Sequence, residues 1–199
     1  ELEYKCAWLA DSQMLWSDCY ATLALAATRT NKIHLGTGVA ITGTRPAPVN
    51  AAGIATINAL APGRTFFGVG AGNTAMRVMG LPPHRIKQFE QYLQTLVPLL
   101  KGEESELHVG DKTLPIKHIM PDNGFVNFKD PIPLYISGFG PKSLALAGKY
   151  GDGAVLGVNT PETVSGMWHL IQEGAKEINR DLKPKENYYT TALTSMVVL

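Results

Sequence analysis

Short apolar runs alternate with amphipathic segments along most of the chain. The runs are apolar at almost every position rather than at every second one, which is typical of strands buried on both faces of a parallel sheet. The amphipathic segments between them have helical spacing and supply the layers that cover such a sheet. The pattern predicts six strands, at Cys6–Ala10, Ile33–Val39, Thr65–Val69, Leu134–Ser137, Ala154–Gly157 and Tyr188–Leu199.

Capping residues and prolines indicate where the intervening helices begin. Ser17 or Asp18 suits the N-cap of a first helix that ends near Thr30. Pro48 suits the first turn of the next helix, because a proline there loses no helical hydrogen bond. The other predicted helices are Pro48–Leu60, Ile86–Leu100, Pro141–Lys149 and a long one from Thr160 to about Asn179, with a loop from Gly70 to Pro83.

The alternation breaks between Glu103 and Asp130. Two short runs, Leu107–Val109 and Lys112–Leu114, flank a Gly110-Asp111 turn, and a two-residue turn of this kind is typical of a β-hairpin. We therefore expect an inserted excursion here rather than another strand and helix.

The order of elements predicts an α/β fold, a (β/α)8 barrel of the TIM type that is incomplete. A full barrel has eight strands and usually about 250 residues, whereas this chain has 199 residues and six predicted strands. Of the eight strands of a complete barrel, we expect this chain to lack the first and the last. We predict one domain over residues 1–199, and an open six-stranded doubly wound sheet is the alternative architecture.

Glycines gather just after the predicted strands, where parallel α/β folds bind their ligands. Gly70, Ala71 and Gly72 follow one strand, and a dinucleotide fingerprint would need a glycine where the chain has Asn73. That signal fails, so the glycines either let a planar ring approach the backbone or serve only a tight turn.

A later elbow has the character of an anion site. It precedes a predicted helix whose first turn carries Lys142 and Ser143, so free amides, the positive helix end and a basic side chain suit a phosphate, although a plain helix cap is the alternative. The elbow consists of Ser137, Gly138, Phe139, Gly140 and Pro141.

Polar side chains also follow the first predicted strand. Asp11, Ser12 and Gln13 place a carboxylate, a hydroxyl and an amide at the same strand end. Asp11 is the candidate acid and Gln13 a second candidate catalytic residue, whereas an aspartate that caps the next loop is the structural alternative.

Composition narrows the class of partner. The chain has 45% hydrophobic residues, and its 18 basic and 17 acidic residues give a net charge of +1. This balance favours a small-molecule substrate and predicts neither nucleic-acid nor membrane binding. Cys6 and Cys19 are too few for a disulfide framework, the histidines are scattered, and we expect a cytoplasmic protein without a metal site.

The ordered set of motifs resembles the bacterial luciferase-like monooxygenase family, which includes methylenetetrahydromethanopterin reductase-like members. The similarity extends over nearly the whole chain. The motifs are Trp8–Gln13, Leu25–Thr30, Ile33–Val39, Ala55–Ile57, Gly63-Arg64, Gly68–Gly72, Ile136–Pro141, Leu146–Gly148 and Gly151–Gly153.

The resemblance implies an oxidoreductase or monooxygenase with FMN or the deazaflavin coenzyme F420 at the strand ends, and a homo-oligomer. It also implies a non-prolyl cis peptide near Gly38 and Val39, beneath the cofactor ring. Two departures from the family are visible: Asn73 stands where its deazaflavin reductases often carry an acid, and the loop at Arg45 lacks a histidine. A catalytically silent flavin-binding barrel is therefore the alternative function.

Overall fold

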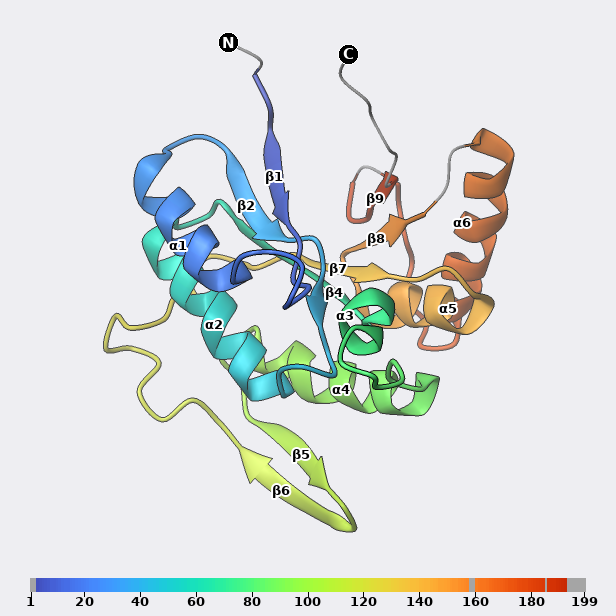
Figure 1. Cartoon of the computed structure of the whole chain (residues 1–199). Coiled ribbons are helices and arrows are strands. Elements are labelled where there is room, and N and C mark those ends of the chain that lie inside the picture. Colours follow the sequence, from blue (N-terminus) through green and yellow to red (C-terminus); the bar gives the residue numbers. More distant parts are fainter. Residues whose placement is uncertain (1–2, 158–159, 185, 193–199) are drawn as a thin grey trace. The chain divides into compact units, whose positions relative to one another are not determined.

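A computed structural model describes residues 3–157, 160–184 and 186–192 (Figure 1). The chain divides into two compact units, Glu1–Ile132 and Pro133–Leu199, and each of them has its own strands and covering helices. Whether the chain acts as one barrel domain stays a prediction.

The first unit contains a parallel sheet with strand order β1 (Cys6–Leu9), β2 (His34–Thr37) and β4 (Thr65–Gly70). β4 is buried at all of its positions, as the continuous apolar run predicts. A two-residue strand, β3 (Ala40–Ile41), also pairs in parallel with β4, opposite Val69 and Gly70.

The predicted strand Ile33–Val39 is confirmed over His34–Thr37, but its last two residues, Gly38 and Val39, are not in a strand. β2 ends at Thr37, and β3 begins at Ala40. The peptide between Gly38 and Val39, which lies between these strands, is cis, as the family resemblance predicts. The buried hydroxyl of Thr37 donates to the Gly68 carbonyl at 2.6 Å and accepts from the Gly68 amide at 3.1 Å, so a side chain continues the contact between β2 and β4 where their backbone pairing stops.

Helices α1 (Cys19–Arg29), α2 (Ala47–Leu60) and α4 (Ile86–Leu99) belong to the same unit. Of the two predicted caps for α1, Asp18 is the one used, because its carboxylate accepts from the Ala21 amide at 2.9 Å. The predicted loop from Gly70 to Pro83 is wrong in part, since it contains the short helix α3 (Asn73–Arg77). Five residues are too few to show helical periodicity in a sequence.

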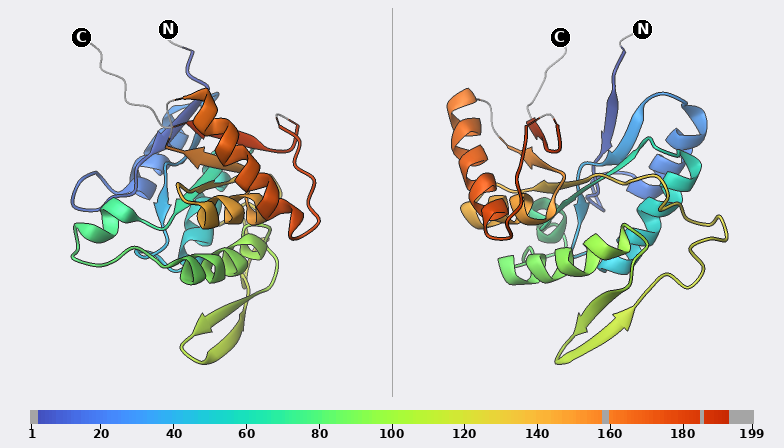
Figure 2. Two further views of the ribbon diagram at one scale, coloured as in Figure 1. Left: turned by 90° about the vertical axis from the view of Figure 1, so that its right-hand side faces the viewer. Right: turned by 180° about the vertical axis from the view of Figure 1, so that it is seen from behind.

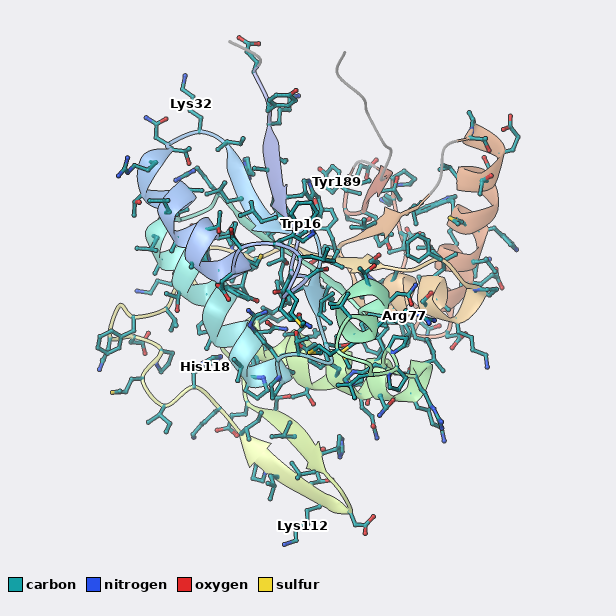
Figure 3. The ribbon with its side chains drawn as sticks, viewed as in Figure 1. Trp16, Lys32, Arg77, Lys112, His118 and Tyr189 are labelled. Atoms are coloured by element: carbon teal, nitrogen blue, oxygen red, sulfur yellow. The ribbon has the colours of Figure 1, made fainter. Side chains whose placement is uncertain are left out.

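The predicted excursion is confirmed as a hairpin of β5 (Ser105–Val109) and β6 (Lys112–Ile116), with Gly110 at a φ of 59° in the turn. Figure 2 shows it projecting beyond α4, and Figure 3 places Lys112 near its tip. The base is attached to α4, because the Thr95 hydroxyl donates to the Glu106 carbonyl and the Ser105 hydroxyl donates to the Thr95 carbonyl.

The second unit has parallel strands in the order β7 (Leu134–Ser137), β8 (Gly153–Leu156) and β9 (Tyr189–Ala192). Its helices are α5 (Pro141–Tyr150) and α6 (Pro161–Lys176), and they pack closely, since a Cβ on Gly148 or Gly174 would collide with the backbone of the other helix. The predicted last strand is confirmed as far as 192, and its remainder lies outside the described residues.

Arg64, in the turn before β4, binds the connection between α1 and β2. Its guanidinium donates to the carbonyls of Ile33 at 2.8 Å and Thr30 at 3.0 Å. Within the described ranges, no helix has both the length and the apolar character needed to cross a bilayer.

Candidate functional site

Three strand ends of the first unit meet around Ile41. The Ile41 amide donates to the Asp11 carboxylate at 3.3 Å, which links the segment after β1 to β3. Ile41 also packs with Ala75 and Met76 of α3, and Val39 covers this cluster. The elbows that the sequence separates by tens of residues are therefore neighbours at the carboxyl ends of β1, β3 and β4.

Asp11 is buried, with 5% of its side chain exposed, and forms an ion pair with Arg45. Nη1 of Arg45 lies 2.7 Å from Oδ1 of Asp11 and 2.5 Å from Oδ2, and Nη2 reaches Asp18 at 3.0 Å. The guanidinium also lies over the ring of Tyr20, 4.9 Å from its centroid, a cation–π arrangement. The Asp11 carboxylate is thus fixed in place on both oxygens, which suits orientation of a neighbouring group.

Buried and half-buried side chains form a neutral network beside this ion pair. The Tyr20 hydroxyl donates to Oδ1 of Asn50 at 2.7 Å, and Nδ2 of Asn50 donates to the Tyr92 hydroxyl at 2.6 Å. Burial raises the pKa of both phenols well above the ordinary value of 10.0, so they stay protonated. Burial likewise raises the pKa of the Cys19 thiol to about 12.

Gln13 and Asn73 both lie at this strand edge; Gln13 contacts α3, and Asn73 is the first residue of α3. Nε2 of Gln13 donates to the Ala75 carbonyl at 2.8 Å. Oδ1 of Asn73 accepts from Nε of Arg77 at 2.6 Å, and both of these side chains are exposed, with Arg77 labelled in Figure 3. Neither contact is catalytic in itself, and the catalytic role of Gln13 stays a prediction.

The glycines of this region already have packing roles within the chain. A Cβ on Gly38 would lie 2.8 Å from Cβ of Trp8, and a Cβ on Gly72 would overlap Ile41. Gly72 also has a φ of 85°, the left-handed region that L side chains rarely adopt. Gly70 and Ala71 use their carbonyls, which accept from the amides of Thr42 at 3.2 Å and His84 at 3.3 Å.

The elbow predicted to hold a phosphate belongs to the second unit. Its residues Ser137, Gly138, Phe139, Gly140 and Pro141 connect β7 to α5, with Gly140 as the N-cap. Gly138 is confined by Ser143, whereas a Cβ added to Gly140 would meet nothing within 4 Å. Pro141 has no amide hydrogen, so Lys142 and Ser143 supply the first-turn amides that lack an intrahelical partner. The open space at Gly140 lies beside backbone amides that have no intrahelical partner, and such a place can accommodate an anion.

Arg45 is the residue of this region that sequence reasoning missed. From the sequence, its loop was interpreted only as lacking a histidine. An arginine that follows one strand and an aspartate that follows another can nevertheless meet at the same edge of a parallel sheet. Among the described residues, no group of three or more histidine, cysteine or acidic side chains is arranged to hold a metal ion.

The chain is similar in sequence to reductases and dehydrogenases. It is 33% identical over 171 residues to the 5,10-methylenetetrahydromethanopterin reductase of Methanolobus tindarius, covering 85% of this chain and 50% of that protein. It is 31% identical over 173 residues to the F420-dependent glucose-6-phosphate dehydrogenase of Beutenbergia cavernae, covering 80% of this chain and 48% of that protein. The chain thus spans about half the length of these relatives.

A solved structure agrees with the predicted architecture. The coenzyme F420 dependent tetrahydromethanopterin reductase of Methanopyrus kandleri superposes with a TM-score of 0.75 at 25% identity, covering 96% of this chain and 57% of that chain. The fold is accordingly that of part of a (β/α)8 barrel, and the doubly wound alternative is not supported. The family model for luciferase-like monooxygenases matches residues 1–197, and the chain therefore belongs to the luciferase-like monooxygenase family.

Proposed function

We propose that this protein is an oxidoreductase that uses the deazaflavin coenzyme F420 to pass a hydride to or from a small organic substrate. The observation that carries the proposal is the meeting of three strand ends around Ile41, at the edge where the family resemblance implies the cofactor ring. Deazaflavin is favoured over FMN because a 31% identical relative and a 25% identical structure are named as F420-dependent.

The protein's own part in such a reaction is mainly orientation. When bound, the cofactor supplies the hydride chemistry, so few protein acids are needed. Asp11, held by Arg45, presents a fixed carboxylate; delivering a proton from it requires opening that ion pair. A positioning role therefore fits the geometry of Asp11 better than the role of general acid. Asn73, whose amide does not exchange a proton at neutral pH, contributes only hydrogen bonds.

The β7–α5 elbow is proposed as the phosphate-binding part of the chain. Gly140 leaves open space next to the amides of Lys142 and Ser143, and α5 presents its positive end there. A homo-oligomer remains part of the proposal, as the family resemblance implies.

The proposal is tested first by binding rather than by turnover. We expect the purified chain to bind coenzyme F420, measured as a change in its fluorescence, more tightly than FMN. Gly140→Val is the informative variant, because φ at Gly140 is −102° and its Cβ position is empty, so the substitution fills the anion site without straining the backbone. Gly166→Val on α6, where a Cβ also meets nothing within 4 Å, is the control.

A loss of affinity of about tenfold in Gly140→Val but not in Gly166→Val supports the elbow's role, on the scale of one lost charge-assisted contact. Equal affinities for the two variants contradict it. Preferential binding of FMN overturns the choice of deazaflavin, and binding of neither cofactor overturns the proposal.

A second experiment separates the enzyme from the silent binding protein. Loaded with reduced F420, the chain is mixed with methylenetetrahydromethanopterin as a hydride acceptor, and loaded with oxidised F420 it is mixed with glucose 6-phosphate as a hydride donor. The oxidation state of the cofactor is followed spectroscopically in both cases. Redox change supports the enzyme, whereas tight cofactor binding without any redox change favours the catalytically silent alternative.

A further inference from the structure

A cavity of about 390 Å³ opens in the first unit and is lined by residues from the start of α2, from helix α4, from hairpin strand β5 and from the adjoining loops. None of its lining residues belongs to the groups proposed for the cofactor. The lining consists of Thr42, Gly43, Thr44, Pro46, Ala47, His84, Gln88, Gln91, Tyr92, Thr95, Leu107 and His108.

Two polar atoms in the lining side chains have no hydrogen-bond partner in the described part of the protein. Thr42 is 3% exposed, and its buried hydroxyl is unpaired. Nδ1 of His84 is also buried and unpaired. Leaving buried polar atoms unpaired is unfavourable, so such atoms beside a cavity indicate that a ligand supplies the missing partner.

The cavity is unsuited to an ion. No aspartate, glutamate, lysine or arginine is among its lining residues. Helix α2 begins here, but Pro46 is its N-cap and Pro48 follows in the first turn, so two of the amides that an anion would need are missing. Burial lowers the pKa of His84, which favours its uncharged ring.

The remaining polar groups include both acceptors and donors. The hydroxyls of Thr44 and Thr95 donate to the carbonyls of Ile41 at 3.1 Å and Glu106 at 2.6 Å, so towards the cavity they can only accept. Oε1 of Gln88 accepts from the Arg85 amide at 2.9 Å, which leaves its NH₂ group as a donor. A lining that has no acidic, lysine or arginine side chain and offers donors and acceptors together matches hydroxyl groups, because each hydroxyl does both.

We propose that this cavity binds a neutral, hydroxyl-rich molecule of the size of one sugar or polyol ring. Its volume lies at the small end of ligand pockets, which are roughly 300–1,000 Å³. The site is a binding function beyond the proposed redox chemistry, and its test needs no cofactor.

The test measures binding of methyl β-D-glucopyranoside and of myo-inositol to the full chain by saturation-transfer NMR, with inorganic phosphate as the charged comparison. We expect both neutral probes to bind and phosphate not to compete with them. Thr42→Val and Gln91→Leu should each weaken binding about tenfold or more, as loss of a hydrogen bond in a polar site does. Gln91 is exposed on α4, so its substitution leaves folding intact.

Thr56→Val is the matched control, since Thr56 is exposed on α2 and its hydroxyl donates to the Ala52 carbonyl away from the cavity. Circular dichroism of each variant separates loss of binding from loss of fold. The proposal is overturned if neither neutral probe binds, if phosphate displaces them, or if Gln91→Leu binds as well as Thr56→Val.

Discussion

Arg45 holds Asp11 by both carboxylate oxygens, with Nη1 at 2.7 Å from one and 2.5 Å from the other. Arg45 lies in the loop after β3, and Asp11 follows β1, so the pair joins two strand ends of the first unit. Because Asp11 is 5% exposed, the pair is largely excluded from water, and the charge of each partner is stabilised mainly by the other partner.

Arg45→Met should therefore destabilise the fold markedly. The substitution leaves the buried Asp11 carboxylate without its counter-ion, and breaking a buried pair in this way costs about 3 kcal/mol. Urea unfolding followed by circular dichroism measures the loss. Arg29→Met, at an exposed position near the end of α1, is the control and should change stability by much less.

The double variant Arg45→Met with Asp11→Asn provides the decisive comparison. With the charge of Asp11 removed as well, most of the lost stability should return, because no unpaired buried charge remains. Strictly additive losses from the two substitutions would show that the ion pair is unimportant.

Much of the fold was predictable because buried parallel strands leave a strong signal. The continuous apolar run of β4 and the turn at Gly110 each determine a local structure almost unaided. Short elements were not predictable, since β3 has two residues and α3 has five, and neither is long enough for its periodic pattern to repeat. The place where β2 ends depends likewise on tertiary contacts, the hydrogen bonds between Thr37 and Gly68 of β4.

The candidate site was predictable as a set of strand ends but not as a set of contacts. Sequence position identified Asp11 as polar and near a strand end, and nothing local indicated that Arg45, many residues later, would occupy both of its oxygens. The cis peptide at Gly38–Val39 came from the family resemblance, since local composition carries no signal for it.

Gly72→Ala should destabilise the protein far more than Gly80→Ala. Both glycines have positive φ values, 85° and 73°. An alanine adopts this left-handed backbone conformation at a cost of roughly 1 kcal/mol, so both substitutions lose that much stability. Only at Gly72 would the new Cβ overlap Ile41, whereas at Gly80 it would meet nothing within 4 Å. Thermal unfolding of the two variants measures the difference, and equal losses would show that the contact with Ile41 is not tightly packed.

The two cysteines should differ sharply in reactivity towards iodoacetamide in the native protein. Partial burial raises the pKa of the Cys6 thiol as well, but this residue is exposed. Cys19 is buried and burial raises its pKa to about 12, so almost none of it is thiolate at pH 8. We expect one thiol to be alkylated quickly and the second only after denaturation. Mass spectrometry of peptides locates the label; rapid labelling of Cys19 would contradict the packing of α1, and Cys6→Ser should abolish the fast phase.

His84 should make the protein less stable as the pH falls. Burial lowers its pKa from the ordinary value of 6.5, so in acid the unfolded chain takes up a proton that the folded chain refuses. The stability associated with neutral His84 is complete above pH 6.5 and declines as the pH falls from there towards the folded-state pKa. His84→Asn removes this titration, so the wild type should lose stability relative to the variant between pH 7 and pH 5 in urea unfolding. The imidazole resonances of His84, identified by their absence in the variant, should titrate below pH 6.5 in the folded protein; parallel stability curves, or a midpoint above that value, would contradict the burial of the ring.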